Sequence, residues 1–207
     1  MARKGFPVVL SAPSGTGKTT LGHLLLEGDK ELELSVSFTT RAPRGEERDG
    51  VDYHFIDAGA FDGMIERQEL IEWAEVHGNR YGSSARSTDE ILRGGHDVLF
   101  DIDVQGGQQI RQRFPEACLI FLVPPSMETL ESRLRGRGTD DDAVIARRLA
   151  AARAEIDAGL ETYDYVVTND RLDRAIFDLT SIVRAHRLKM ISRRDIRGRL
   201  LGETGPR

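Results

Sequence analysis

Residues 6–26, FPVVLSAPSGTGKTTLGHLLL, join a short apolar run to a glycine-containing loop and then to a leucine-rich segment. The run FPVVLS is β-branched and apolar throughout, which is typical of a strand buried on both faces of a parallel sheet. After the loop, leucines recur at helical spacing from Leu21 to Leu26. The order of strand, glycine loop and helix is the context in which a phosphate-binding loop is found.

The loop departs from the pattern G-x-x-x-x-G-K-[ST] at its first position, where Ala12 stands. Such a loop points backbone N–H groups and a helix N-terminus at phosphate oxygens, and glycine removes the Cβ that would block close approach. Gly15 and Gly17 are retained, Lys18 supplies a charge at the β and γ phosphates, and Thr19 supplies a hydroxyl to Mg²⁺. An ordinary glycine turn is the alternative, but the flanking strand and helix favour nucleotide binding. The expected contacts are Ala12, Pro13, Ser14, Gly15, Thr16, Gly17, Lys18, Thr19 and Thr20.

The composition predicts a soluble globular protein, since 39% of the 207 residues are hydrophobic and 30% are charged. The formal charge of −5 argues against nucleic acid or an anionic membrane as a partner, so local basic clusters must hold any anionic ligand. No apolar run approaches the roughly 20 residues that span a bilayer. Cys118 is the only cysteine and lies in the apolar run CLIFLV, which excludes a disulfide within the chain and predicts burial in a reducing cytoplasm.

Further buried strands alternate with helical segments. HDVLFDID (96–103), ACLIFLVPP (117–125) and YDYVVTND (163–170) are strand candidates, and GGQQIRQRF (106–114) and the chain from about Leu172 are helix candidates. This alternation predicts an α/β fold of three layers around a central, mostly parallel sheet.

Two regions do not follow the alternation. ELSVSFTT (33–40) and DYHFID (52–57) are strand-like and predict a small antiparallel insertion, whereas FDGMIERQELIEWAEV (61–76) has helical spacing and HGNRYGSS (77–84) would break that helix. Residues 126–150 are rich in arginine, and Thr139 followed by Asp142 predicts the start of a second helix there. We therefore expect one domain, with a core of residues 1–34, 85–125 and 151–207, an insertion of residues 35–84 and a lid of residues 126–150.

Six segments in this order resemble guanylate kinases, which transfer the γ-phosphate of ATP to GMP. They lie within residues 8–170 and read SAPSGTGKTT, SVSFTTRAPRGEERDGVDYHF, IEWAEVHGNRYG, DVLFDIDVQG, LRGRGTDDD and YDYVVTND. Alanine at the first loop position is familiar in bacterial members. The resemblance implies a P-loop fold, ATP bound by the glycine loop, GMP and dGMP as acceptors bound by the insertion, and a lid over ATP. It also implies Mg²⁺ as the cofactor, held by Thr19 and, through water, by Asp101, for which helix capping is the alternative role.

The resemblance assigns the acceptor site. Two arginines and two tyrosines match the positions that hold the GMP phosphate, and two guanidinium groups and two phenols suit a dianion. A carboxylate can accept the N–H and NH₂ of guanine together, whereas adenine presents an acceptor there. Without the resemblance, Glu72 would be interpreted as a surface carboxylate on a helix. The implied GMP-binding residues are Ser37, Arg41, Arg44, Tyr53, Glu72, Tyr81, Ser83 and Asp103.

The resemblance also assigns the groups that promote transfer. Arg137 and Arg148 match lid arginines, with Arg133 and Arg135 as additional candidates, although a charged, alanine-rich helix is otherwise a solvated face. Asn169 matches a position near the adenine of ATP. Because the GMP phosphate is already mostly dianionic at pH 7, the reaction needs positive charge and alignment rather than a general base. The implied catalytic residues are Lys18, Arg41, Arg44, Arg137 and Arg148.

Two departures and two rival functions are open at this point. Arg80 stands where the family commonly has tyrosine, and Glu46 where it usually has glycine. One rival is a non-catalytic binding module like those of membrane-associated scaffold proteins, which typically lack a working phosphate loop. The other is a kinase acting on a phosphorylated ribose, which would not need Ser37, Glu72 and Asp103 together. The sequence predicts no oligomeric state.

Overall fold

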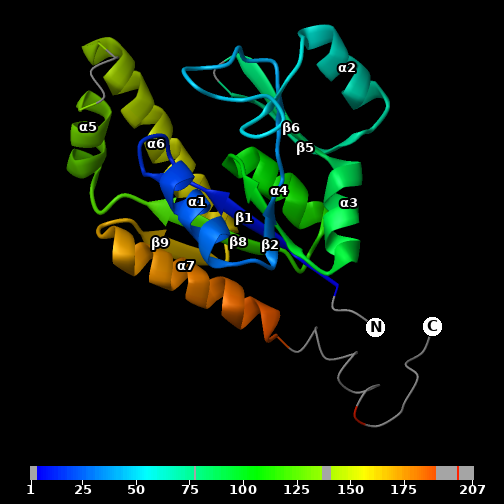
Figure 1. Ribbon diagram of the computed structural model, residues 1–207. Coiled ribbons are helices and arrows are strands. Elements are labelled where there is room, and N and C mark those ends of the chain that lie inside the picture. The colour runs from blue at the N-terminus through cyan, green and yellow to red at the C-terminus, as the bar shows by residue number, and fades with distance from the viewer. Residues whose placement is uncertain (1–3, 77, 137–140, 190–199, 201–207) are drawn as a thin grey trace.

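A computed structural model describes residues 4–76, 78–136, 141–189 and 200, and its core is a five-stranded sheet in the order β2-β7-β1-β8-β9 (Figure 1). All four strand pairs in this sheet are parallel. β1 lies at its centre, where Val9 is in register with Phe100 on one side and Leu119 on the other. The strands are β1 (Pro7–Ser11), β2 (Leu32–Leu34), β7 (Asp97–Asp101), β8 (Cys118–Val123) and β9 (Tyr165–Thr168).

Helices cover both faces of this sheet (Figure 1). On one face, α1 (Lys18–Gly28) and α7 (Leu172–Arg187) pack leucines such as Leu25 and Leu179 onto Val8 and Ile120. On the other face lie α3 (Ala85–Gly94), α4 (Val104–Arg113) and α6 (Asp142–Thr162). Helices on both faces of a parallel sheet confirm the predicted three-layer α/β fold. Because the strands are buried on both faces, their sequences are apolar throughout.

Most helices begin where an aspartate or serine side chain accepts a backbone N–H from the first turn. Such caps are present at α2 (Ala58–Glu66), α3, α4, α5 (Met127–Arg135) and α6. Asp141 caps α6 by accepting from Val144 N at 2.8 Å, so this helix begins at Asp142. The start that we predicted at Thr139 lies outside the described residues.

A second, four-stranded sheet lies within residues 35–84, in the order β4-β3-β6-β5. Its strands are β3 (Phe38–Thr39), β4 (His54–Phe55), β5 (Leu70–Val76) and β6 (Asn79–Ser84). The two segments predicted as antiparallel strands contribute β3 and β4, which pair in parallel instead. The antiparallel pairs, β3–β6 and β5–β6, involve two strands that the sequence did not predict.

The helix predicted over residues 61–76 is wrong beyond Glu66. α2 ends there, Gln68 has a left-handed φ of 55°, and residues Leu70–Val76 form strand β5 instead. The segment 77–84, predicted as a helix break, contributes β6, which pairs with β5 after a turn in which Gly78 has a φ of 77°. Helical spacing of apolar residues is therefore overridden here by cross-strand pairing.

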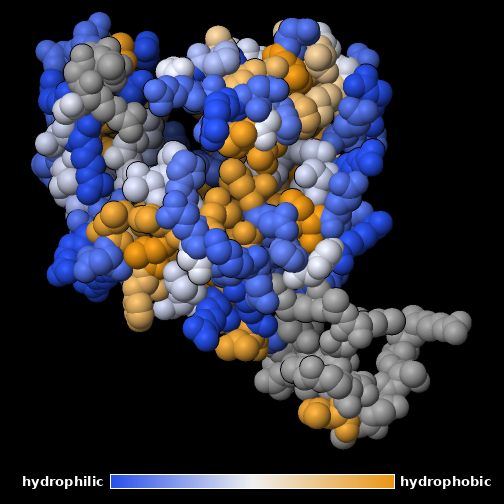
Figure 2. Space-filling view, viewed as in Figure 1, coloured by the Kyte–Doolittle hydropathy of each residue, from blue (hydrophilic) through white to orange (hydrophobic). Residues whose placement is uncertain are grey.

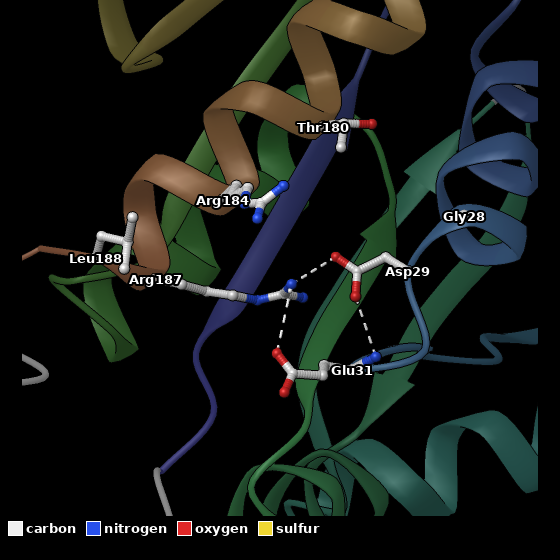
Figure 3. A pocket seen from close by; sticks show the side chains of 7 residues that line it. All are labelled: Gly28, Asp29, Glu31, Thr180, Arg184, Arg187 and Leu188. Atoms are coloured by element: carbon white, nitrogen blue, oxygen red, sulfur yellow. Dashed lines mark hydrogen bonds and ion pairs between the residues drawn. The ribbon is translucent and has the colours of Figure 1, made fainter.

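An ion-pair cluster around Arg187, at the end of α7, lies at the amino ends of the strands, on the side of the sheet away from the glycine loop (Figure 3). Its guanidinium contacts Asp97 at 2.6 Å and Asp29 at 2.6 Å, and lies 3.5 Å from Glu31. The Asp97 side chain is fully buried, so this carboxylate depends on nearby donors for its charge. A cavity of about 550 Å³ beside the cluster is lined by Gly28, Asp29, Glu31, Thr180, Arg184, Arg187 and Leu188.

Two further expectations concern the apolar segments. Cys118 is fully buried, as predicted, and burial raises the pKa of its thiol to about 12. Within the part of the chain that the structure describes, every helix is too short or too polar to cross a membrane.

Candidate active site

The candidate site lies at the carboxyl ends of the central strands, where open α/β sheets bind their ligands. The glycine loop leaves β1 at Ser11, Asp101 ends β7, and Asn169 follows β9. The smaller sheet stands on one side of this edge and α5 with α6 on the other (Figure 1), and Figure 2 shows the surface hollowed between them.

The glycine loop has the backbone that close approach to phosphate requires. Gly15 and Gly17 have left-handed φ angles of 93° and 97°, which only glycine adopts without strain. Ala12 does not have a positive φ, so its methyl group is compatible with the backbone of the loop. Gly17 is the N-cap of α1 and has no side chain to satisfy the first helical N–H groups, which suits an anion there.

Lys18 is held by the end of β7. Its ammonium contacts the Asp101 carboxylate and donates to the carbonyl oxygen of Ile102 at 3.1 Å. The same carbonyl accepts the Ser11 hydroxyl at 2.7 Å, and Tyr163 donates to that hydroxyl at 2.6 Å. Tyr163 opens the segment YDYVVTND, in which the sequence assigned no role to this tyrosine, and it reaches the loop from a distant part of the chain.

Asn169 and Arg133 support the glycine loop from behind. The Asn169 amide donates to the Thr16 carbonyl oxygen at 2.7 Å, and a Cβ on Gly17 would lie 2.6 Å from the same amide nitrogen. Arg133 donates to the carbonyl oxygens of Thr16 at 3.3 Å and Asn169 at 2.9 Å. Both side chains therefore position the loop, a role that the sequence did not indicate.

Glu72 lies on β5 with 3% of its surface exposed, so it is not the surface carboxylate that its sequence context suggested. Ser83 donates its hydroxyl to Glu72 at 2.6 Å, and the Ser37 hydroxyl lies 3.5 Å from that of Ser83. Burial raises the pKa of Glu72 to about 7, against the Ser83 hydrogen bond and with the help of the nearby Asp103 charge. Asp103 is the N-cap of α4, where it accepts from Gly106 N at 2.9 Å.

A basic and aromatic cluster also lies within residues 35–84. Arg41 is 8% exposed, and its Nε donates to the Tyr81 hydroxyl at 3.2 Å. Its guanidinium carbon lies 5.2 Å from the centre of the Tyr53 ring, within cation–π range. The structure thus brings Arg41, Tyr53 and Tyr81 together. Arg44 is exposed, and in the described residues its guanidinium takes part in none of the hydrogen bonds or ion pairs found.

A carboxylate that we did not predict belongs to this cluster. Glu47 forms a two-point ion pair with Arg41, with both N···O distances at 2.9 Å, and also accepts from Arg44 N at 2.7 Å. The Arg41 guanidinium lowers the pKa of Glu47, so this carboxyl is ionised at neutral pH.

The arginine-rich segment contributes less to the described site. Arg135 pairs with Glu131 at 2.9 Å and Asp142 at 2.5 Å and so joins α5 to α6. Arg148 lies half-buried on α6. Arg137 lies outside the described residues.

The departure at Arg80 has a structural explanation. Its guanidinium contacts Asp62, donates to Ala58 O at 3.0 Å and stacks 5.1 Å from the centre of the Phe61 ring. Arg80 therefore fastens α2 onto β6. Glu46 is exposed in the turn after Gly45, whose φ is 54°.

The donor set near the loop fits a hard divalent ion. Thr19 is exposed on the first turn of α1, and Asp101 lies beside Lys18. Clusters of three or more His, Cys, Asp or Glu side chains suited to a metal do not occur among the residues described. Mg²⁺ does not require one, because it binds through one or two protein oxygens together with substrate phosphates and water.

Comparisons with known proteins agree on one family. A family model described as guanylate kinase matches residues 4–186. Guanylate kinase from Myxococcus xanthus (strain DK1622) is 54% identical over 89% of this chain and 88% of its own, and that from Anaeromyxobacter dehalogenans (strain 2CP-C) is 53% identical over 92% and 85%. The crystal structure of guanylate kinase from Anaplasma phagocytophilum superposes with a TM-score of 0.80 at 33% identity and covers 98% of both chains.

Proposed function

The chain belongs to the guanylate kinase family, and on that premise we propose which of its residues carry the ATP-dependent phosphorylation of GMP to GDP. The observation that supports GMP as acceptor is the buried Glu72 carboxylate with its hydroxyl partners Ser83 and Ser37. A buried carboxylate of this kind binds a base that has adjacent N–H and NH₂ groups. With adenine bound, the carboxylate would be left without these donors.

The glycine loop binds the ATP phosphates in this proposal. Backbone N–H groups from Ser14 to Thr20 surround the β and γ phosphates, and Lys18 places its ammonium on the γ-phosphate side. To contact the triphosphate, the Lys18 ammonium must give up part of its contact with Asp101. Asn169 holds the Thr16 carbonyl oxygen of the loop and matches the family position near the adenine of ATP.

The insertion binds GMP. Glu72, Ser83, Ser37 and Asp103 recognise the guanine edge, while Arg41, Arg44, Tyr53 and Tyr81 hold the phosphate. We assign dGMP as a second acceptor, because the residues proposed here recognise the base and the phosphate, which GMP and dGMP share. Residues 35–84 then act as the acceptor-binding part of the domain and residues 126–150 as the lid over ATP.

Catalysis by these residues is a matter of charge and alignment. The attacking group is a phosphate oxygen of GMP, with a second pKa of about 6, so a general base is not needed. Lys18, Arg41, Arg44 and Arg148 offset the repulsion between this dianion and the triphosphate, and Arg137 joins them by its match to the family. ATP-dependent transfer implies a divalent metal; Thr19 and Asp101 would hold Mg²⁺, which when bound neutralises charge on the β and γ phosphates.

A coupled assay of ADP release tests the function, with GMP, dGMP, AMP, UMP and ribose bisphosphate as acceptors. We expect turnover with GMP and dGMP and none above background with the other three. Preference for AMP or ribose bisphosphate over GMP would overturn the acceptor assignment. Glu72→Gln is the matched variant, because it keeps the side-chain shape but replaces an acceptor oxygen by a donor, and it should lose GMP turnover selectively.

A further inference from the structure

We propose that Glu47 is a positioning residue for the acceptor phosphate: it fixes the Arg41 guanidinium and the turn that carries Arg44, so that Tyr81 and Arg44 present their donors to GMP. The proposal rests on the function proposed above and deepens its phosphate site. Glu47 belongs to none of the residue sets assigned so far and has no role in recognising guanine.

Glu47 joins the two arginines through hydrogen bonds of its own. One carboxylate oxygen accepts from Arg41 Nη2 at 2.9 Å, and the other accepts from Arg41 Nη1 at 2.9 Å and from Arg44 N at 2.7 Å. The Glu47 backbone N–H also donates to the Arg44 carbonyl oxygen at 3.1 Å. This residue therefore closes the turn and at the same time holds the plane of the guanidinium.

The Arg41 guanidinium is almost fully used by the protein. Of the five N–H groups of an arginine, Nε donates to Tyr81, Nη1 donates to Ala42 O and Glu47, and Nη2 donates once to Glu47. One N–H on Nη2 is left by these contacts. A phosphate that enters this site can thus take one direct hydrogen bond from Arg41 while the rest of the guanidinium keeps its place.

The remaining phosphate donors are oriented by Arg41. The Tyr81 oxygen accepts from Arg41 Nε at 3.2 Å, so the hydroxyl keeps its own hydrogen for donation to an anion. The Tyr53 ring packs against the guanidinium and lies 6.0 Å from the Tyr81 ring, centre to centre. Since Arg41 orients Tyr81 and Glu47 orients Arg41, losing Glu47 should misplace several phosphate contacts together.

The charge balance agrees with a supporting role. Glu47 forms an ion pair with Arg41, which is 8% exposed and costly to bury without a counter-ion. Arg44 keeps its charge for the substrate. The alternative is that Glu47 occupies the phosphate position as a competing anion and must be displaced; in that case its removal would tighten GMP binding. The two roles predict opposite signs for the same measurement.

The test compares Glu47→Ala, Glu47→Gln and Glu46→Ala with the wild type. Glu46 is the matched control, because it is the exposed neighbour and its loss makes the same change in net charge. KM for GMP, KM for ATP and kcat are measured, together with competitive inhibition by guanosine, which has the base but no phosphate. Circular dichroism and a thermal midpoint identify the variants that fold.

We expect Glu47→Ala to raise KM for GMP by about tenfold or more, because the charge-assisted contacts that position the phosphate of GMP would be lost. KM for ATP and inhibition by guanosine should change by less than about twofold, Glu47→Gln should restore part of the loss, and Glu46→Ala should match the wild type. If Glu47→Ala does not fold, Glu47→Gln carries the test, with a smaller rise in KM for GMP alone.

Four results would overturn the proposal. These are a lower KM for GMP without the Glu47 carboxylate, an unchanged KM, an equal loss of guanosine and GMP binding, and an equal effect of Glu46→Ala. Failure of the proposed function is distinguishable, because it would show as absent GDP formation by the wild-type protein before any variant is made.

Discussion

The side-chain amide of Asn169, just after strand β9, donates to the carbonyl oxygen of Thr16 at 2.7 Å and so fixes the middle of the glycine loop. The backbone carbonyl oxygen of Asn169 in turn accepts from the Arg133 side chain of α5 at 2.9 Å. The loop, the end of the sheet and the arginine-rich helix are therefore linked by hydrogen bonds around one residue. A ligand that moves the loop will act on α5 through this link.

Asn169→Ala should weaken ATP binding and lower stability. The variant leaves the buried Thr16 carbonyl with only the longer contact from Arg133, at 3.3 Å, and losing a buried hydrogen bond costs about 1–3 kcal/mol. We expect KM for ATP to rise severalfold while KM for GMP changes little, with a lower midpoint in thermal unfolding. Asp170→Ala, at the exposed next position, is the control. An unchanged KM for ATP would mean that the loop keeps its shape without Asn169.

Lys18→Ala should remove most of the transfer activity and leave GMP binding largely intact. Lys18 contacts Asp101 and Ile102 at the loop and none of the residues assigned to guanine. Loss of one charge aimed at the transferring group costs about 10²- to 10³-fold in kcat. GMP affinity is measured by calorimetry without ATP. Equal losses of turnover and GMP binding would show instead that Lys18 is structural.

GMP affinity should rise with pH through about 7. Burial raises the Glu72 pKa from 4.5 to about 7, and guanine recognition needs the ionised form. The ligand-free fold thus keeps a proton that the unfolded chain loses above pH 4.5, so this group's contribution to stability falls between about pH 4.5 and 7. Binding of guanine should release that proton. For one such group we expect about tenfold weaker binding at pH 6 than at pH 8.

Guanosine separates this effect from titration of the GMP phosphate, which guanosine lacks. Its inhibition constant should show the same dependence between pH 6 and 8 in the wild type and lose it in Glu72→Gln. A flat profile for the wild type would place the Glu72 pKa well below 7 or remove this carboxylate from guanine recognition.

Fluorescence of Trp73, the only tryptophan, should respond to GMP. Trp73 follows Glu72 on the edge strand β5, and Gln109 of α4 clamps its backbone, accepting from its N–H at 3.1 Å and donating to its carbonyl oxygen at 2.7 Å. Trp73 is 40% exposed as a residue, so a change at Glu72 should alter the solvation of its indole ring. A titration with GMP against AMP checks this. No response at saturating GMP would indicate that base binding leaves β5 unmoved.

The central sheet and the glycine loop were predictable because both are local patterns. A strand buried on both faces is apolar throughout, and the loop carries its glycines and Lys18 in one short stretch. The segment 61–76 was not predictable in the same way. Its helical spacing is real, but Leu70–Val76 gains more from pairing with β6 than from extending α2.

The supporting roles of three residues at the site could not be predicted from the sequence. Tyr163, Arg133 and Glu47 each act through a partner, and for Tyr163 and Arg133 that partner lies more than a hundred positions away in the chain. Glu47 is close to Arg41 in sequence, yet a turn rich in charges gives no sign of which carboxylate pairs with which arginine. Geometry decides these contacts, and a single sequence does not contain it.

The ion-pair cluster at Arg187 bears on the order in which the protein can complete its fold. Asp29 and Asp97 come from elements that are synthesised early, whereas Arg187 ends α7, which is synthesised after every strand of the central sheet. Until α7 has left the ribosome, the buried carboxylate of Asp97 lacks this cation. A nascent chain can therefore pair the strands of the central sheet before the ion pairs at Asp97 form, and these ion pairs form only when α7 packs against the sheet.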